Sequence, residues 1–246
     1  MVRFWKVVNE VLKKSDIILE VVDARYPDLS RNIEIEGKMK SAKKDMIIIF
    51  NKSDLVPMRK RIKPKDVKYC VYTSATKNLG TSKLRNMIRK LSKKDEVTTL
   101  GIVGYPNSGK SSLINVLRQK KVAKTSSTAG YTKGIQKIRL SQGVYLLDTP
   151  GVYAYREKDE WKLVLIGAKS CNTVKDPETV AMMLLGMVKR KSFRETYGIN
   201  YKVDVDELID NLAEKLKYYS KGKLLNRDKT CRKIIRDWQA GILTER

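Results

Sequence analysis

The chain has 246 residues, 41% hydrophobic and 32% charged, a composition typical of a folded protein with one large domain or two small ones. Its longest apolar run, around 180–185, is too short to cross a bilayer, and charges interrupt the first apolar residues, so we expect neither a membrane span nor a signal peptide. The net charge is +25, histidine is absent, and three scattered cysteines (Cys70, Cys171, Cys231) argue against a disulfide framework or zinc site and favour the cytoplasm.

The first two thirds of the chain alternate between strand and helix patterns. Apolar residues at helical spacing predict a helix over 4–12. Short β-rich runs then predict strands over 17–22, 46–50, 68–73 and 99–103, with an amphipathic helix over 82–91. A further helix follows over 112–117, and two strands at 136–140 and 144–147 meet near Gly143.

The last third contains helical patterns only. We expect helices over 178–187, 205–218 and 227–239, the first of them begun by Asp176 and Pro177. The sequence therefore predicts two domains, 1–155 and 156–246. The first is an α/β domain with a doubly wound, mostly parallel sheet, and the second is a smaller, all-helical C-terminal domain.

A glycine-rich loop lies at the centre of the first domain. Residues 104–112 read Gly-Tyr-Pro-Asn-Ser-Gly-Lys-Ser-Ser and fit the phosphate-loop pattern G-x-x-x-x-G-K-[ST] between a predicted strand and helix. We expect the backbone from Asn107 through Ser108, Gly109 and Ser112 to surround phosphate oxygens. Lys110 would neutralise the β- and γ-phosphates, and the Ser111 hydroxyl would bind Mg²⁺. An ordinary glycine turn is the alternative, and the flanking strand and helix disfavour it.

Two segments near the N-terminus favour guanine over adenine. In Asn51-Lys52-Ser53-Asp54, the Asp54 carboxylate can accept from guanine N1–H and N2–H₂ together, while Asn51 suits the O6/N7 edge or braces loops and the Lys52 stem packs on the base. Ser74-Ala75 would direct a backbone N–H to O6. Each segment is weak evidence alone, but both follow predicted strands, where open α/β sheets bind ligands.

Two further segments complete a site for GTP or GDP with Mg²⁺. Asp148-x-x-Gly151 would reach Mg²⁺ through water and bind the γ-phosphate through the Gly151 N–H. Thr132 is the candidate threonine that coordinates Mg²⁺ in the triphosphate state; a plain surface threonine is the alternative. We expect Lys110, Thr132 and Gly151 to act on the phosphate that is hydrolysed.

The order of these motifs is unusual, because the guanine-reading segments precede the phosphate loop. This order, together with Asp23-Ala24-Arg25, resembles the circularly permuted GTPases of ribosome assembly, the YlqF/YawG (RbgA-like) family, over roughly residues 15–153. The resemblance implies a GTP-regulated factor acting on the large ribosomal subunit or its precursor. Two features depart from the family: the chain lacks the histidine implicated in hydrolysis in bacterial relatives, and Ala129 stands where relatives usually have proline.

Hydrolysis without a partner is expected to be slow. Val152 occupies the position after Gly151 where many GTPases have a water-orienting glutamine, and valine cannot hydrogen-bond water. Asn107 is a candidate K⁺ ligand, which would place positive charge near the phosphates; simple bracing of the loop is the equal alternative.

The positive charge predicts a polyanionic partner, ribosomal RNA in preference to DNA, against the alternative of a solvated lysine-rich surface. Candidate contacts are the helical domain and clusters of basic residues at 59–61, at Lys63, Lys65 and Lys68, at Arg118, Lys120 and Lys121, and over 215–236. A nucleotide-gated RNA-binding module, or a regulator of a protein target, with incidental turnover is the alternative to a GTP-hydrolysing assembly switch. The sequence indicates no particular oligomeric state.

Overall fold

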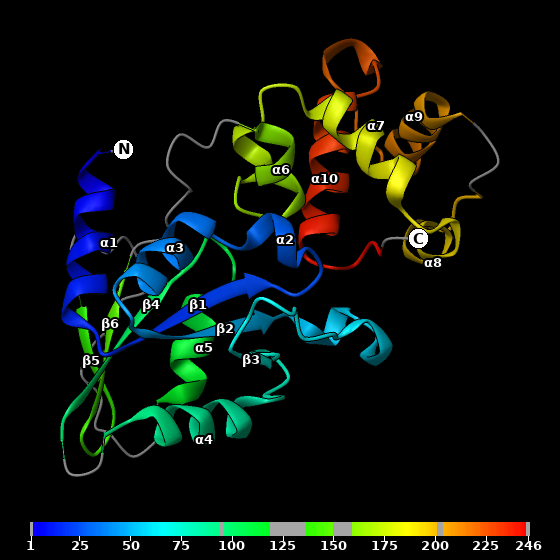
Figure 1. The fold of residues 1–246 in the computed structure, drawn as a ribbon. Coiled ribbons are helices and arrows are strands. Elements are labelled where there is room, and N and C mark those ends of the chain that lie inside the picture. Colours follow the sequence, from blue (N-terminus) through cyan, green and yellow to red (C-terminus); the bar gives the residue numbers. More distant parts are fainter. Residues whose placement is uncertain (1, 94–95, 119–135, 150–158, 201–203, 245–246) are drawn as a thin grey trace. The chain divides into compact units, whose positions relative to one another are not determined.

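A computed structural model describes residues 2–93, 96–118, 136–149, 159–200 and 204–244. The chain divides into two compact units, Met1–Lys158 and Asp159–Arg246 (Figure 1). None of the helices in the described ranges has the length and apolar character needed to cross a membrane.

The first unit is built on a six-stranded sheet in the order β3-β2-β1-β4-β6-β5. The strands are β1 (Ile17–Asp23), β2 (Asp45–Asn51), β3 (Tyr69–Tyr72), β4 (Thr98–Val103), β5 (Gln136–Ser141) and β6 (Val144–Asp148). All neighbours pair in parallel except β5, which forms an antiparallel hairpin with β6. The predicted mostly parallel sheet is confirmed, and each predicted strand is present within one or two residues of its expected ends.

Helices cover both faces of this sheet, as a doubly wound fold requires (Figure 1). They are α1 (Val2–Lys14), α2 (Pro27–Ser30), α3 (Ile33–Ser41), α4 (Thr81–Leu91) and α5 (Lys110–Leu117). Buried side chains of α1 and α3, such as Val8 and Ile35, pack with Ile18 on one face. Leu84 of α4 and Leu113 of α5 pack on the other face.

Helices α2 and α3 are absent from the sequence prediction. The Ile-Glu-Ile-Glu alternation at 33–36 is not a helical pattern, and Tyr26-Pro27 indicated only a turn. In the structure the Asn32 side chain accepts a hydrogen bond from the Ile35 N–H (3.2 Å) and caps α3, while Ile35 and Met39 share the buried face. Capping and burial therefore override the local pattern.

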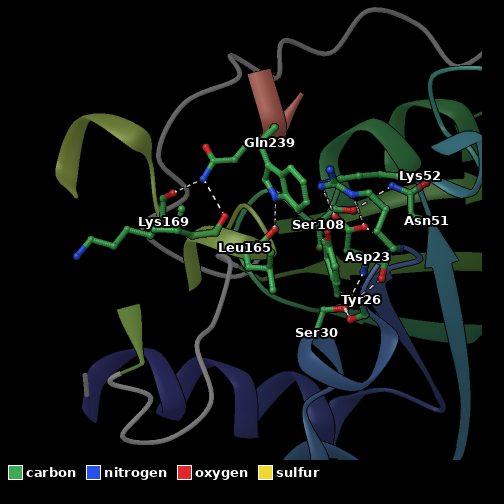
Figure 2. Close-up of polar contacts among 12 residues, drawn as sticks. Asp23, Tyr26, Ser30, Asn51, Lys52, Ser108, Leu165, Lys169 and Gln239 are labelled. Atoms are coloured by element: carbon green, nitrogen blue, oxygen red, sulfur yellow. Dashed lines mark hydrogen bonds and ion pairs between the residues drawn. The ribbon is translucent and has the colours of Figure 1, made fainter. Parts of the chain in front are cut away.

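The second unit consists of helices and short 3₁₀ turns, with no strand among its described residues. Its α-helices are α6 (Glu160–Leu165), α7 (Pro177–Met187), α8 (Arg190–Tyr197), α9 (Val205–Lys215) and α10 (Arg227–Gln239). Trp238 of α10 is buried and its indole N–H donates to the Leu165 carbonyl (3.3 Å), while the Gln239 amide donates to the carbonyls of Val164 and Lys169 (Figure 2). These bonds fasten α10 to the α6 region.

Two boundaries in this unit are informative. Asp176 accepts from the Thr179 N–H (3.1 Å) and Pro177 is the first residue of α7, so the predicted helix start is confirmed. Helix α9 ends at Lys215, before the predicted end at 218, because Lys217 adopts a left-handed conformation (φ 53°) and the Tyr218 N–H turns back to the Ala213 carbonyl. Helices α6 and α8 are additional to the prediction.

Candidate nucleotide site

The candidate site lies along one edge of the sheet. Because β1, β2, β3, β4 and β6 are parallel, their carboxyl ends meet at the same edge. Four of the five strands end at, or one to two residues before, a residue with a candidate role: Asn51, Ser74, Gly104 and Asp148; the fifth, β1, ends at Asp23. Asp23 and Asn51 are direct partners in the β1–β2 register. The placement that the sequence predicted for these motifs is confirmed.

The glycines of the phosphate loop are required by close approach of neighbouring atoms. A Cβ on Gly104 (φ 145°) would lie 2.4 Å from the Val21 carbonyl oxygen. A Cβ on Gly109 (φ 98°) would lie 2.1 Å from the Asn51 amide nitrogen. Helix α5 starts directly after Gly109, with Ser111 and Ser112 exposed in its first turn, so the N-terminus of α5 opens at the loop.

Lys110 lies folded within this loop. Its ammonium donates to the carbonyl oxygens of Gly104 (2.9 Å) and Tyr105 (2.8 Å), and the side chain is buried. Burial lowers the Lys110 pKa to about 8, an effect that the negative charge of Asp148 opposes. A bound anion would raise this pKa again, because an opposite charge nearby favours the ammonium.

Asp148 at the end of β6 faces a similar environment. Burial raises the pKa of its carboxyl, against the lowering effects of Lys110 and of the Thr149 N–H. Its Oδ1 atom is buried and has no hydrogen-bond partner in the described part of the chain. An unpartnered carboxylate oxygen, with the exposed Ser111 hydroxyl on α5, is a donor set that suits a hydrated Mg²⁺ ion. The other expected phosphate and metal residues, Thr132 and Gly151, lie outside the described residues.

Asn51 joins the two segments that are expected to read guanine to the phosphate loop. Its Nδ2 donates to the Ser108 carbonyl oxygen (3.0 Å), as Figure 2 shows. Its Oδ1 accepts from the Ala75 N–H (3.1 Å) and the Thr73 hydroxyl (3.3 Å). The sequence offered two roles for Asn51, contact with the O6/N7 edge of guanine or bracing of loops. These hydrogen bonds correspond to the second role. The Ala75 N–H that was expected on the base is hydrogen-bonded to Asn51 here.

The side chains of Asp54 and Ser74 differ sharply in exposure. Asp54, in the 3₁₀ turn η1 (Ser53–Leu55), is exposed, and among the described residues its carboxylate forms no hydrogen bond or ion pair. Ser74 is fully buried, and its hydroxyl accepts from the Lys77 N–H (3.2 Å), which shapes the 74–79 turn. Asp54 is therefore available to a ligand, whereas Ser74 supports the position of Ala75.

Sequence reasoning assigned no role in the site to Asp23 and Arg25. The buried Asp23 carboxylate binds the Lys52 ammonium (2.8 Å) and the Arg25 guanidinium (2.8 Å). Burial alone would raise the Asp23 pKa, but hydrogen bonds and charge from Arg25 and Lys52 hold it below its ordinary value. Lys52 itself has a left-handed backbone (φ 60°). Asp23 thereby anchors the Lys52 side chain. In the sequence, the position of Asp23 at the end of a predicted strand, which Asn51 shares, was the feature that could have indicated a role in the site.

Comparison with known families agrees with this geometry. A family model described as 50S ribosome-binding GTPase matches residues 99–224, and one described as RsgA GTPase matches residues 21–157. Among curated proteins, an uncharacterized GTP-binding protein of Methanocaldococcus jannaschii is 39% identical over 245 residues, which cover 97% of this chain and 65% of that protein. Nucleolar GTP-binding protein 2 of Neurospora crassa is 33% identical over 251 residues, covering 97% of this chain and 40% of that protein. The chain thus spans about two fifths to two thirds of the length of these relatives.

A solved structure shares the architecture of the whole chain. GNP-bound YlqF from T. maritima superposes with a TM-score of 0.68 and 23% identity, covering 98% of this chain and 96% of that one. Its GDP-bound form gives a TM-score of 0.67. At this level of identity the likeness shows a common fold.

Proposed function

Since the chain belongs to the GTPase family represented by the 50S ribosome-binding and RsgA GTPases, we propose that it is a GTP-binding and GTP-hydrolysing switch that acts in assembly of the large ribosomal subunit. The observation that carries the proposal is the Asn51 bridge. Through its bonds to Ser108 and Ala75, this side chain makes a base-reading segment and a phosphate loop parts of one site. A site that reads guanine and phosphate together is what a GTP switch needs.

Each described residue has a distinct proposed task. The exposed Asp54 carboxylate accepts from guanine N1–H and N2–H₂, and the Lys52 stem, held by Asp23, packs against the base. The Lys110 ammonium leaves the Gly104 and Tyr105 carbonyls for the β- and γ-phosphate oxygens. Phosphates also receive backbone N–H bonds from the Ser108–Ser112 stretch.

Ser111 and Asp148 are the proposed residues that hold Mg²⁺, Asp148 through water. When bound, the ion neutralises charge that develops on the phosphates during transfer. Asn107, exposed and with a left-handed backbone (φ 57°), is the proposed K⁺ ligand. Thr132 keeps its proposed role of coordinating Mg²⁺ in the triphosphate state, and the Gly151 N–H its proposed bond to the γ-phosphate. Replacing K⁺ with Na⁺ should slow turnover only if Asn107 has the ion role.

The proposed partner is the large ribosomal subunit or its precursor, contacted through ribosomal RNA. The net charge of +25 exceeds what a nucleotide site needs, and relatives are named nucleolar GTP-binding protein 2 and nuclear/nucleolar GTPase 2. The proposed place of action is where the large subunit is assembled, the cytoplasm in a cell without a nucleus. The helical unit is the proposed second contact with the particle.

The test measures GTP turnover by the full chain with and without purified large ribosomal subunits. We expect slow turnover alone, because Val152 cannot orient water, and a rise of tenfold or more with the subunits. A nonhydrolysable GTP analogue should also increase co-sedimentation with the subunits relative to GDP. Equal turnover and equal sedimentation in every condition would refute the switch.

One observation favours a second candidate, a nucleotide-gated RNA-binding module with incidental turnover. The chain has neither the histidine nor a polar residue at position 152 that would assist hydrolysis. In that case the bound nucleotide alters only the affinity of the protein for the subunits. Adding subunits then leaves GTP turnover at its basal rate.

A further inference from the structure

The segment between β2 and β3 is an unusual crossover. Two adjacent parallel strands are normally joined by an α-helix that packs on the sheet. Residues 52–68 instead contain only two 3₁₀ turns, η1 and η2 (Met58–Lys60). A connection of this length without a regular helix is uncommon in a compact domain and is usually functional. Figure 1 shows this light-blue segment extending outward beyond β3. We call residues 57–65 the arm.

The arm is fastened at its base. Val56 and Val67, on either side of it, are buried and pack with Phe50 of β2. The Arg61 guanidinium donates to the Val56 carbonyl (2.9 Å), and the Tyr72 hydroxyl of β3 donates to the Ile62 carbonyl (3.0 Å). These bonds define the conformation of the arm, so its outward side chains are held in place rather than left without support.

Two large apolar side chains point away from this base. Met58 is 80% exposed and Ile62 is 71% exposed, the highest values among the exposed large hydrophobic residues of the described chain. Five of the nine residues of the arm are basic and none is acidic: Arg59, Lys60, Arg61, Lys63 and Lys65. Exposed apolar groups surrounded by positive charge are characteristic of an interaction surface for a partner that is both anionic and apolar.

We infer that the arm is an RNA-binding surface, in which Arg59, Lys60 and Lys65 contact phosphates and Met58 and Ile62 pack against unpaired bases. RNA combines a phosphate backbone with apolar base faces, and apolar side chains of this kind pack between or against bases. Arg61 and Lys63 are left out of this set because both side chains already donate hydrogen bonds at the base of the arm. Arg61 donates to the Val56 carbonyl and Lys63 to the Lys68 carbonyl (2.9 Å). The choice of RNA over an acidic protein rests on the proposed function; the sequence already offered the basic residues of this segment as contacts, and the structure adds the exposed apolar pair beside them.

The test uses the full chain and fluorescence anisotropy with a labelled single-stranded RNA of mixed sequence and an RNA duplex of equal length. One variant removes charge (Arg59→Ala with Lys60→Ala), and one removes apolar surface (Met58→Ser with Ile62→Ser). The matched control is Lys83→Ala with Lys90→Ala, two exposed basic residues of α4 in the same unit. GDP affinity of every variant verifies that the unit is folded.

We expect the charge variant to bind both RNAs at least tenfold more weakly at about 0.1 M salt. Its plot of log affinity against log salt should be shallower by about 1.4 for single strands, because two phosphate contacts are lost. The apolar variant should bind the single strand about fivefold or more weakly than wild type does. Its affinity for the duplex should change little, and the dependence of its affinity on salt should be unchanged. The control pair should stay within twofold of wild type.

Wild-type RNA binding by both arm variants, or equal losses in the arm and control variants, would overturn the inference. So would retained RNA binding with lost binding to ribosomal proteins extracted from large subunits, which would make the arm a protein contact. If wild-type protein still co-sediments with large subunits in its GTP form, such a result refutes the arm alone. Failure of wild type to respond to large subunits in turnover and sedimentation refutes the proposed function instead.

Discussion

The side-chain amide of Asn51 donates to the backbone carbonyl of Ser108 across 3.0 Å, between residues 57 positions apart in the chain. The bond connects the end of β2 with the phosphate loop that follows β4. Since Oδ1 of the same side chain holds the Ala75 N–H, a single amide fixes three loops. We therefore expect base recognition and phosphate recognition at the proposed site to depend on one buried residue.

Replacing Asn51 should damage affinity and stability together. Asn51→Ala leaves the Ala75 N–H and the Ser108 carbonyl without their partner, which costs about 1–3 kcal/mol for each buried polar group. We expect a lower free energy of unfolding and a GDP affinity at least tenfold weaker, measured by denaturation and by titration. Asn115→Ala, an exposed position on α5, is the control. Normal GDP affinity in Asn51→Ala would show that the bridge does not organise the site.

Gly109 tests the same contact from the other side. In Gly109→Ala the new Cβ would lie 2.1 Å from the Asn51 amide nitrogen at a backbone φ of 98°, so the loop or the amide must move. We expect loss of nucleotide binding by titration calorimetry. Gly37→Ala on α3, where no atom lies within 4 Å of the new Cβ, should bind normally and be as stable or slightly more stable. Equal behaviour of both variants would contradict the packing argument.

Asp54 should determine which base is bound. Asp54→Asn replaces an acceptor of two N–H groups with an amide, which can donate to the C2 carbonyl of xanthine. We expect weaker GTP binding and a relative gain for xanthosine triphosphate, compared by competition with a fluorescent nucleotide. The exposed Asp28 supplies the control Asp28→Asn. Equal losses for both nucleotides would mean that Asp54 does not read that edge.

Lys110 should matter for binding and carry a pH signature in stability. Its pKa in the folded protein, about 8, lies below the ordinary 10.5, so the unfolded chain binds more protons between these values and this contribution to stability rises with pH. Lys110→Met, which keeps the apolar stem, should fold and lose triphosphate binding by about a hundredfold or more. Denaturation at pH 7 and pH 10 should show that the free energy of unfolding of wild type, relative to that of the variant, increases as pH rises. A pH-independent difference would refute the buried ammonium.

Glu20 should make the first unit sensitive to alkaline pH. Glu20 is fully buried on β1, and burial, followed by the charge of Glu36, raises its pKa to about 8 although Arg31 acts in the opposite direction. The folded state therefore binds more protons between about pH 4.5 and 8, and stability falls as pH rises through that range. Glu20→Gln keeps an acceptor for the Asn32 N–H and should become more stable than wild type by roughly 1–3 kcal/mol at pH 9. Denaturation at pH 5 and pH 9 measures the difference in the free energy of unfolding between the variant and wild type. The same difference at both pH values would contradict the prediction.

The sequence by itself determined the α/β architecture, the positions of the strands and the nucleotide motifs. Those features are local: runs such as 46–50 are buried on both faces and need β-rich apolar residues, and a phosphate loop needs glycine where φ is positive. Their order along the chain indicated the permutation, and parallel pairing brought their ends to one edge.

Only the tertiary structure decided how the site is held together. Whether Asn51 bonds to Ser108, and whether Asp23 holds Lys52, depends on strands β1, β2 and β4 lying next to one another, which no local pattern encodes. Helix α3 and the arm, which has no α-helix, were also decided at that level, because a cap, a buried face or a fastening bond such as Tyr72 to Ile62 outweighs intrinsic preference. Such interactions join residues distant in sequence, so they exist only once the chain has folded.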